Sequence, residues 1–193
     1  HGWIREYDKT RYVQYESGNP KNNISDVICP MYPTMSWLED VMADDSDLRP
    51  FIMCEYAYAK SNSNGNFKEF WDYVNKYPRF QGGFIWDYID QSIYKKDRYG
   101  KEFQAYGGDF GERPTDYNFS GNGIVYGGDR TESPKMQEVK FCYQNISIDV
   151  QKDKAVVKNK NLFVNTDAFD CVVILEKEGK KLKEVPMEIS VEP

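Results

Sequence analysis

Four short apolar runs recur in the first half of the chain, and a polar or aromatic side chain follows each within two residues. They occupy residues 12–15, 27–30, 51–54 and 83–85. Runs that are apolar throughout are typical of parallel strands covered on both faces, because neither face meets water. Residues 66–77 carry apolar side chains at helical spacing between two of these runs, so the pattern predicts an α/β fold.

Functional side chains at the carboxyl ends of parallel strands are the arrangement of a (β/α)8 TIM barrel. Four such strands make about half of a barrel, so we expect the first 143 residues to form part of a TIM barrel. A further helix is predicted over residues 36–42, with Ser36 as its N-cap and Glu39 three residues later. Residues 1–11 read as the end of a helix that begins upstream, which predicts that a longer protein contains this chain.

The pattern changes from about residue 144. Short alternating runs at 146–150, 155–158, 162–165 and 171–175 are separated by polar turns, and Glu178-Gly179 marks a hairpin turn. Residues 144–193 are therefore predicted to be the opening strands of an incomplete β-sandwich. Before them, residues 100–134 are rich in Gly, Asp, Asn and aromatic residues, as in a long functional loop.

Composition excludes several classes of protein. The formal net charge is −6 and the basic residues are scattered, so a nucleic-acid-binding surface is not expected. No apolar run reaches the length of a membrane span. The four cysteines are far apart, which favours free thiols over a disulfide framework or a zinc site. The only histidine is His1, so a histidine-based catalytic triad is nearly excluded.

Glu55 follows the third apolar run and precedes Tyr56-Ala57-Tyr58. A carboxylate at a strand end among aromatic side chains suits covalent or acid/base chemistry, although such a residue more often caps a loop or forms a salt bridge. Trp86 and Asp87 follow the next run in the same way. Trp86 is a candidate floor for a sugar ring, and a packing role at the barrel rim is equally compatible with its position.

Three other positions are weaker candidates. Tyr32 also ends a run, and its hydroxyl could hydrogen-bond a carboxylate on the neighbouring strand. Glu16 and Glu55 are a formal carboxylate pair for glycoside hydrolysis, but two strands separate them, so a structural salt bridge is favoured for Glu16. The loop of Phe119 and Asn122 offers a backbone carbonyl and an amide oxygen, which suit a hard cation, while a plain turn is the more common meaning.

Several long motifs together resemble one known family. They are RPFIMCEYA at residues 49–57, YPRFQGGFIWDYIDQ at 77–91 and AYGGDFG at 105–111, with supporting matches at 13–16, 28–32 and 118–123. In this order they resemble the large bacterial β-galactosidases of glycoside hydrolase family 2. The resemblance covers essentially the whole chain and is strongest over residues 11–140. It implies that residues 1–143 are the C-terminal part of the TIM-barrel catalytic domain, about the C-terminal half of the (β/α)8 barrel.

The resemblance implies a retaining double displacement on terminal β-D-galactosides such as lactose. By motif position, Glu55 resembles the nucleophile and Tyr32 the tyrosine that hydrogen-bonds it. The family's second glutamate, the acid/base, lies upstream of this chain. The isolated chain is therefore expected to be close to inactive. Contacts to the substrate are implied for Met31, Tyr58, Trp86 and Asn122.

The resemblance also implies metal ions. Phe119, through its carbonyl, and Asn122 resemble two ligands of the family's sodium site, whereas the magnesium ligands lie upstream of this chain. Tyr58 stands where the family usually has a sugar-contacting histidine, and Lys60-Ser61 stands where it has Met-Gly. These departures leave a glucuronide or mannoside open as the substrate.

A carbohydrate is the partner that the resemblance implies, and the complete protein is expected to be a homo-oligomer. A bacterial cytoplasmic location is favoured on the same grounds. The remaining alternative is a non-catalytic sugar-binding or structural fragment, since half a barrel leaves open strand edges that tend to pair.

Overall fold

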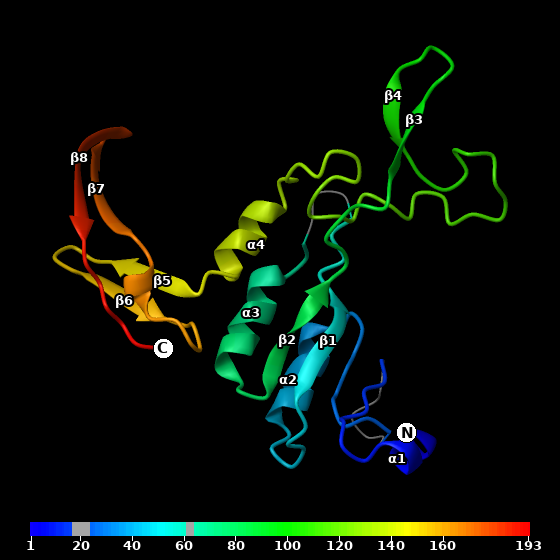
Figure 1. The fold of residues 1–193 in the computed structure, drawn as a ribbon, viewed down its shortest axis with the longest axis horizontal. Helices are drawn as coiled ribbons and strands as arrows, with labels where there is room; N and C mark the ends of the chain where they lie inside the picture. The colour runs from blue at the N-terminus through cyan, green and yellow to red at the C-terminus, as the bar shows by residue number, and fades with distance from the viewer. Residues whose placement is uncertain (17–23, 61–63) are drawn as a thin grey trace. The chain divides into compact units, whose positions relative to one another are not determined.

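The structure is a computed structural model that describes residues 1–16, 24–60 and 64–193. The chain divides into two compact units, His1–Cys142 and Tyr143–Pro193 (Figure 1). Ser61, one of the departures from the family pattern, lies outside the described residues.

The centre of the first unit is a parallel pair of strands, β1 (Phe51–Tyr56) and β2 (Phe80–Ile85), which lie side by side in Figure 1. Both strands were predicted, and both are confirmed. Phe51 and Phe80 pack edge to face, with ring centroids 4.8 Å apart, and both side chains are buried. Parallel pairing brings the carboxyl ends of the two strands to the same edge of the sheet.

The run at 27–30 continues this sheet only through isolated parallel bridges, Ile28 with Phe51 and Met31 with Glu55. Pro30 has no N–H to donate, which limits a regular ladder here. The predicted strand at 12–15 does not form. The Asp26 carboxylate accepts the Val13 N–H at 2.6 Å, so a side chain takes the place of a strand partner.

Helices α2 (Met35–Ala43) and α3 (Phe67–Lys76) contribute to the core around this sheet. The helix predicted at 66–77 is confirmed, and its Phe67 stacks on Tyr56 with ring centroids 5.4 Å apart. The predicted cap of α2 is wrong. Thr34 is the N-cap and accepts the Trp37 N–H at 3.3 Å, because Ser36 already lies in the first turn.

The first unit also contains the short helices α1 (Gly2–Tyr7) and α4 (Met136–Cys142) and an antiparallel hairpin. The hairpin joins β3 (Ile93–Lys96) to β4 (Glu102–Ala105). Its turn includes Gly100 in the left-handed region, at φ 81°. The predicted loop therefore begins later than expected, since β4 occupies its first residues. Among the described residues, the strands of this unit do not close into a barrel, and the α/β class is confirmed.

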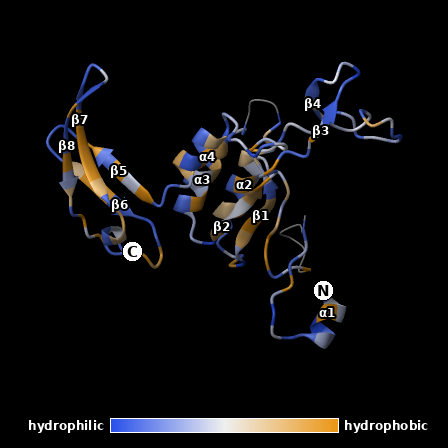
Figure 2. Cartoon of the chain, turned by 45° about the horizontal axis from the view of Figure 1, so that its top comes forward, coloured by the Kyte–Doolittle hydropathy of each residue, from blue (hydrophilic) through white to orange (hydrophobic). Residues whose placement is uncertain are grey.

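The second unit has two antiparallel hairpins. One joins β5 (Ile146–Val150) to β6 (Ala155–Asn159), and the other joins β7 (Cys171–Lys177) to β8 (Lys180–Met187). Glu178 and Gly179 both have positive φ, at 51° and 74°, as a tight two-residue hairpin turn requires. Figure 2 shows hydrophobic residues along β7, where the side chains from Val172 to Leu175 are 43–58% exposed.

The strand predicted at 162–165 is not formed. Asn165 instead caps the short 3-10 helix η1 (Thr166–Ala168), and its side chain accepts the Asp167 N–H at 3.1 Å. Across the residues that the structure describes, no helix combines the length and the apolar character needed to cross a bilayer.

Candidate active site

Glu55 lies at the carboxyl end of β1, one residue before the strand ends, and its side chain is partly buried. The Glu55 backbone carbonyl accepts the Tyr32 N–H at 2.9 Å, and Met31 forms a parallel β-bridge with Glu55. Tyr32 has a left-handed backbone, with φ 47°. The structure therefore brings three of the predicted site residues together at one edge of the sheet.

The Tyr32 side chain also interacts with the Glu55 carboxylate. Burial and, next in importance, a hydrogen bond to Glu55 raise the pKa of Tyr32 well above its ordinary value. A phenol with a raised pKa keeps its proton, so Tyr32 donates to the carboxylate. A carboxylate held by a donor is fixed in orientation, as a nucleophile must be.

Tyr58 links Tyr32 to the loop that contains Phe119. Its ring meets Tyr32 edge on, with centroids 5.9 Å apart, and lies 5.6 Å from the Phe119 ring. Burial and, secondarily, the charges of Asp87 and Asp90 raise the pKa of Tyr58. Its hydroxyl is buried and has no hydrogen-bond partner within the described part of the chain. A buried hydroxyl without a partner suits a ligand that carries hydroxyl groups.

Trp86 follows β2 and is held through its backbone. Its N–H donates to the Tyr56 carbonyl at 3.2 Å, and its carbonyl accepts the Ala59 N–H at 3.2 Å. The indole Nε1 is buried and lacks an acceptor among residues 1–16, 24–60 and 64–193. The backbone of Trp86, directly after β2, is thus bonded to the end of β1 and to the segment that follows it. Its indole N–H is left without an acceptor among the described residues.

Asp87 comes next in the chain, and its peptide bond to Trp86 is cis. Burial, followed by repulsion from Asp90, raises the pKa of Asp87 to about 6, while Lys135 acts in the opposite direction. One of its carboxyl oxygens has no hydrogen-bond partner among the residues described. Among the carboxyl groups of this region, Asp87 therefore has the pKa that burial raises most clearly.

Asn122 is completely buried, and neither atom of its side-chain amide has a partner in the described portion of the chain. Its backbone carbonyl accepts the Asp87 N–H at 3.0 Å. Buried amide groups in folded proteins are nearly always hydrogen-bonded. The unpaired oxygen therefore suits a hard cation or a ligand hydroxyl, and the sodium ligand that the resemblance implies at this position stays a prediction.

The loop that carries Asn122 is fixed by Asp90. The Asp90 carboxylate accepts from the Ser120 hydroxyl at 3.0 Å and from the Gly121 N–H at 2.8 Å. The Phe119 side chain is 51% exposed at the start of this loop. Neither Ser120 nor Asp90 is among the predicted site residues, although each lies within a motif that matches the family.

Lys135 is the site residue that the sequence could not indicate. Its ammonium donates to the Ala59 carbonyl at 2.6 Å and to the Gly121 carbonyl at 3.2 Å. Burial lowers the pKa of Lys135, and the charges of Asp90 and Asp87 oppose this effect. A single lysine before a helix carries no motif, so only the fold reveals its position.

The salt bridge of Glu16 and the binding of magnesium are two of the predictions that the structure does not test. Glu16 is exposed and directly precedes residues that are not described, so its salt bridge stays a prediction. In the described segments no group of three or more His, Cys, Asp or Glu side chains is arranged to hold a metal ion. Magnesium binding stays a prediction about the complete protein.

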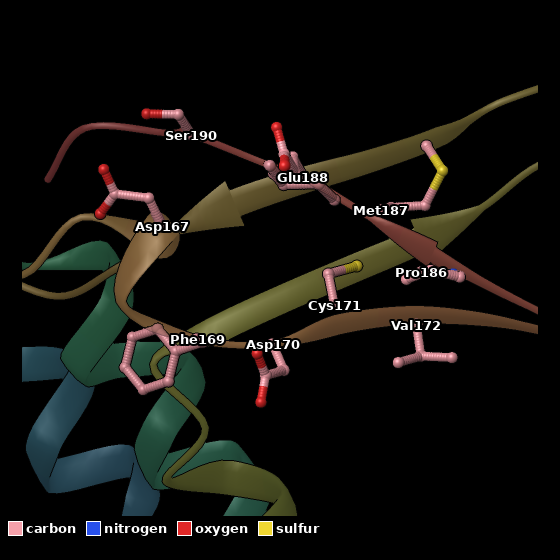
Figure 3. A pocket seen from close by; sticks show the side chains of 10 residues that line it. Asp167, Phe169, Asp170, Cys171, Val172, Pro186, Met187, Glu188 and Ser190 are labelled. Carbon is pink, nitrogen blue, oxygen red and sulfur yellow. The ribbon is translucent and has the colours of Figure 1, made fainter.

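Two cavities bear on the choice of site. One, of about 520 Å³, borders the Asn122 loop. It is lined by Lys60, Asp90, Ser92, Gln104, Tyr106, Asn118, Ser120, Gly121 and Tyr126. The other, of about 890 Å³, lies within the second unit beside η1 and the free ends of β7 and β8 (Figure 3). Neither cavity is lined by any of the predicted site residues.

Comparison with known proteins assigns most of the chain to one family. Residues 1–148 match the family described as glycosyl hydrolases family 2, TIM barrel domain. The chain is 46% identical to a β-galactosidase of Halalkalibacterium halodurans and 48% identical to one of Clostridium acetobutylicum, each over 99% of the chain. A β-galactosidase of Photobacterium profundum is 40% identical over 86% of the chain.

The chain spans about a fifth of the length of these relatives: 19%, 21% and 18% respectively. The matched family region includes both strands of the parallel pair and every predicted site residue. From its matched region and its relatives, this chain belongs to glycosyl hydrolase family 2 and carries part of that family's TIM-barrel domain.

Proposed function

We propose that the protein containing this chain is a retaining β-galactosidase in which Glu55 is the nucleophile. The observation that carries the proposal is the Glu55 carboxylate at the end of β1 with the Tyr32 phenol bonded to it. The names of the relatives support the galactoside as the substrate class.

In the first step, Glu55 attacks the anomeric carbon and forms a glycosyl ester as the bond to the leaving oxygen breaks. A second carboxyl group, outside this chain by family resemblance, gives its proton to the leaving oxygen. In the second step that group removes a proton from water, and the water attacks the same carbon. The sugar leaves with its original configuration, and Glu55 regains its charge.

Tyr32 keeps the Glu55 carboxylate oriented and stabilises its charge between turnovers. Trp86 offers a flat ring for the apolar face of the galactose, supported by its fixed backbone between the two strand ends. Tyr58 and Met31 complete the wall on the side of Glu55. The buried, unpaired hydroxyl of Tyr58 supports a hydrogen bond to a sugar hydroxyl.

We assign sodium to the loop of residues 119–122. Asn122, through its amide oxygen, and Phe119, through its carbonyl, would hold the ion together with residues from elsewhere in the complete protein. The support is the completely buried Asn122 amide, which has no partner among the described residues. A bound sodium ion would supply positive charge to a hydroxyl group of the sugar. Magnesium belongs to the complete protein by resemblance alone.

A covalent label tests the role of Glu55. The complete protein is incubated with 2,4-dinitrophenyl 2-deoxy-2-fluoro-β-galactoside, whose fluorine slows both steps while the good leaving group lets the first proceed. Proteolysis and mass spectrometry are expected to find the fluorosugar on Glu55, within the peptide that contains β1. Protein labelled at another carboxylate would contradict the assignment. Glu55→Gln protein treated in parallel is the control, and it should stay unlabelled at this peptide.

Substrate class is tested separately on the complete protein with aryl β-galactoside, β-glucuronide and β-mannoside. The highest kcat/KM is expected for the galactoside. Preference for the glucuronide or mannoside would leave the glycosidase mechanism in place and overturn the substrate. Tyr58 is the position that makes this comparison necessary, because the family usually has histidine there.

A further inference from the structure

Lys135 is the one charged side chain that is buried in the part of the chain described here, with 9% of its surface exposed. It lies directly before α4. Its backbone carbonyl accepts the Asn64 side-chain N–H at 3.1 Å, which holds the lysine in place from a second direction. Burying an ammonium group is costly unless it is well paired, so its surroundings indicate what it does.

The ammonium of Lys135 joins two segments that come from different parts of the chain. Ala59, which accepts at 2.6 Å, lies four residues after Glu55, and Gly121, which accepts at 3.2 Å, lies in the Asn122 loop. Both acceptors are backbone carbonyls, so the bonds fix the path of the main chain and not a side-chain rotamer. Lysine suits this task because its donors can turn toward separate acceptors.

The N–H groups of the same two residues, Ala59 and Gly121, are also hydrogen-bonded. The Ala59 N–H donates to the Trp86 carbonyl, and the Gly121 N–H donates to the Asp90 carboxylate. Lys135 therefore completes a set of bonds that joins the segments after β1 and β2 to the Asn122 loop. Asp87 and Asp90 supply negative charge that favours the buried cation.

Side chains close to the joined carbonyls contact each other. Tyr58 precedes Ala59, and Phe119 comes two residues before Gly121, and their rings lie 5.6 Å apart. Without the cation, the buried Ala59 carbonyl and the more exposed Gly121 carbonyl would both lose this donor, and the two segments would no longer be joined through it. The contact of Tyr58 with Phe119 depends on the spacing that Lys135 sets.

We propose that Lys135 is a positioning residue for the sugar site, which it serves by joining the Ala59 and Gly121 carbonyls. The inference rests on the proposed function for its link to substrate, and on the fold alone for its link to the two segments. Lys135 touches neither Glu55 nor the reacting atoms, so it acts on substrate binding and not on the chemical step.

The test uses Lys135→Met in the complete protein, since methionine keeps much of the apolar stem and removes the ammonium. Lys140→Met is the matched control, because Lys140 lies in α4, the helix that follows Lys135, and its side chain is 67% exposed. Two quantities are measured for each variant: kcat and KM on an aryl β-galactoside, and amide hydrogen exchange of the segments 57–60 and 118–123.

The expected result is a rise in KM of roughly tenfold or more for Lys135→Met, from the loss of two charge-assisted hydrogen bonds, with kcat changed much less. The two segments should exchange faster than in the wild-type protein, while α2 (Met35–Ala43) exchanges at the same rate. The Lys140→Met protein should match the wild type in both measurements.

The proposal is overturned if KM and exchange in Lys135→Met equal those of Lys140→Met, or if the loss is confined to kcat. If Lys135→Met does not fold, Lys135→Gln is measured against the same criteria, since glutamine keeps a donor and removes the charge. A wild-type protein that does not cleave galactosides would refute the proposed function, and the exchange data would still decide the positioning role.

Discussion

Removal of one hydroxyl group tests how far the Glu55 carboxylate depends on its neighbour. In Tyr32→Phe the ring is retained, along with its edge-on contact with Tyr58 at 5.9 Å. The backbone bond from Tyr32 to the Glu55 carbonyl is also retained. Only the phenol donor to the carboxylate is lost, so the perturbation isolates one interaction.

The magnitude follows from the type of bond and its exposure. Hydrogen bonds to charged groups contribute about 1.5–3 kcal/mol, and solvent replaces part of this where it has access. Tyr32 is 39% exposed, so about 1–2 kcal/mol is the expected loss. At 1.4 kcal/mol for each factor of ten, kcat/KM on an aryl β-galactoside should fall roughly 5- to 30-fold.

The assay is steady-state turnover by the complete protein, with thermal unfolding measured alongside to exclude a loss of fold. Tyr7→Phe is the matched control, because Tyr7 is 93% exposed, and its kcat/KM should equal that of the wild type. Tyr32→Phe with an unchanged kcat/KM would refute the reasoning, since the phenol would then contribute nothing to the carboxylate.

Three further predictions concern the fold and the loop. Gly123→Ala should lower the free energy of unfolding by about 1–3 kcal/mol or more, because its Cβ would lie 2.1 Å from the backbone nitrogen of Asp90. Gly2→Ala, with open space around it, should not be destabilising in the same denaturant titration. Thr34→Ala should cost about 1 kcal/mol in that titration through the loss of the α2 cap, and an unchanged midpoint would contradict the cap assignment. Replacing sodium chloride with choline chloride should raise KM in the wild type and leave it unchanged in Asn122→Ala; equal responses would contradict sodium binding at this loop.

Features that depend on local pattern could be predicted from the sequence. Apolar runs identified β1 and β2, helical spacing identified α3, and the Glu178-Gly179 pair identified the β7–β8 turn. Each of these signals lies within the element that it specifies. The resemblance then identified Glu55 and its neighbours, which the structure places around one edge of the sheet.

Features that depend on which of several hydrogen-bonding partners a group meets in the fold could not be predicted from the sequence. Thr34 and Ser36 are both good caps, and the choice depends on where the helix begins. The apolar run at 162–165 resembles a strand, but the Asn165 side chain accepts the Asp167 N–H and caps the 3-10 helix η1 instead. Lys135 has contacts 76 and 14 residues away in the chain, and no local pattern encodes them.

The nucleophilic role of Glu55 is tested most directly by chemical rescue of Glu55→Gly in the complete protein. An aryl β-galactoside with a good leaving group is supplied with sodium azide, which can occupy the space left by the carboxylate. If Glu55 is the nucleophile, azide attacks the face of the sugar that Glu55 used, and the product is the α-galactosyl azide. A β-galactosyl azide would instead assign Glu55 as the acid/base, and wild-type activity in the variant without azide would contradict any catalytic role for it.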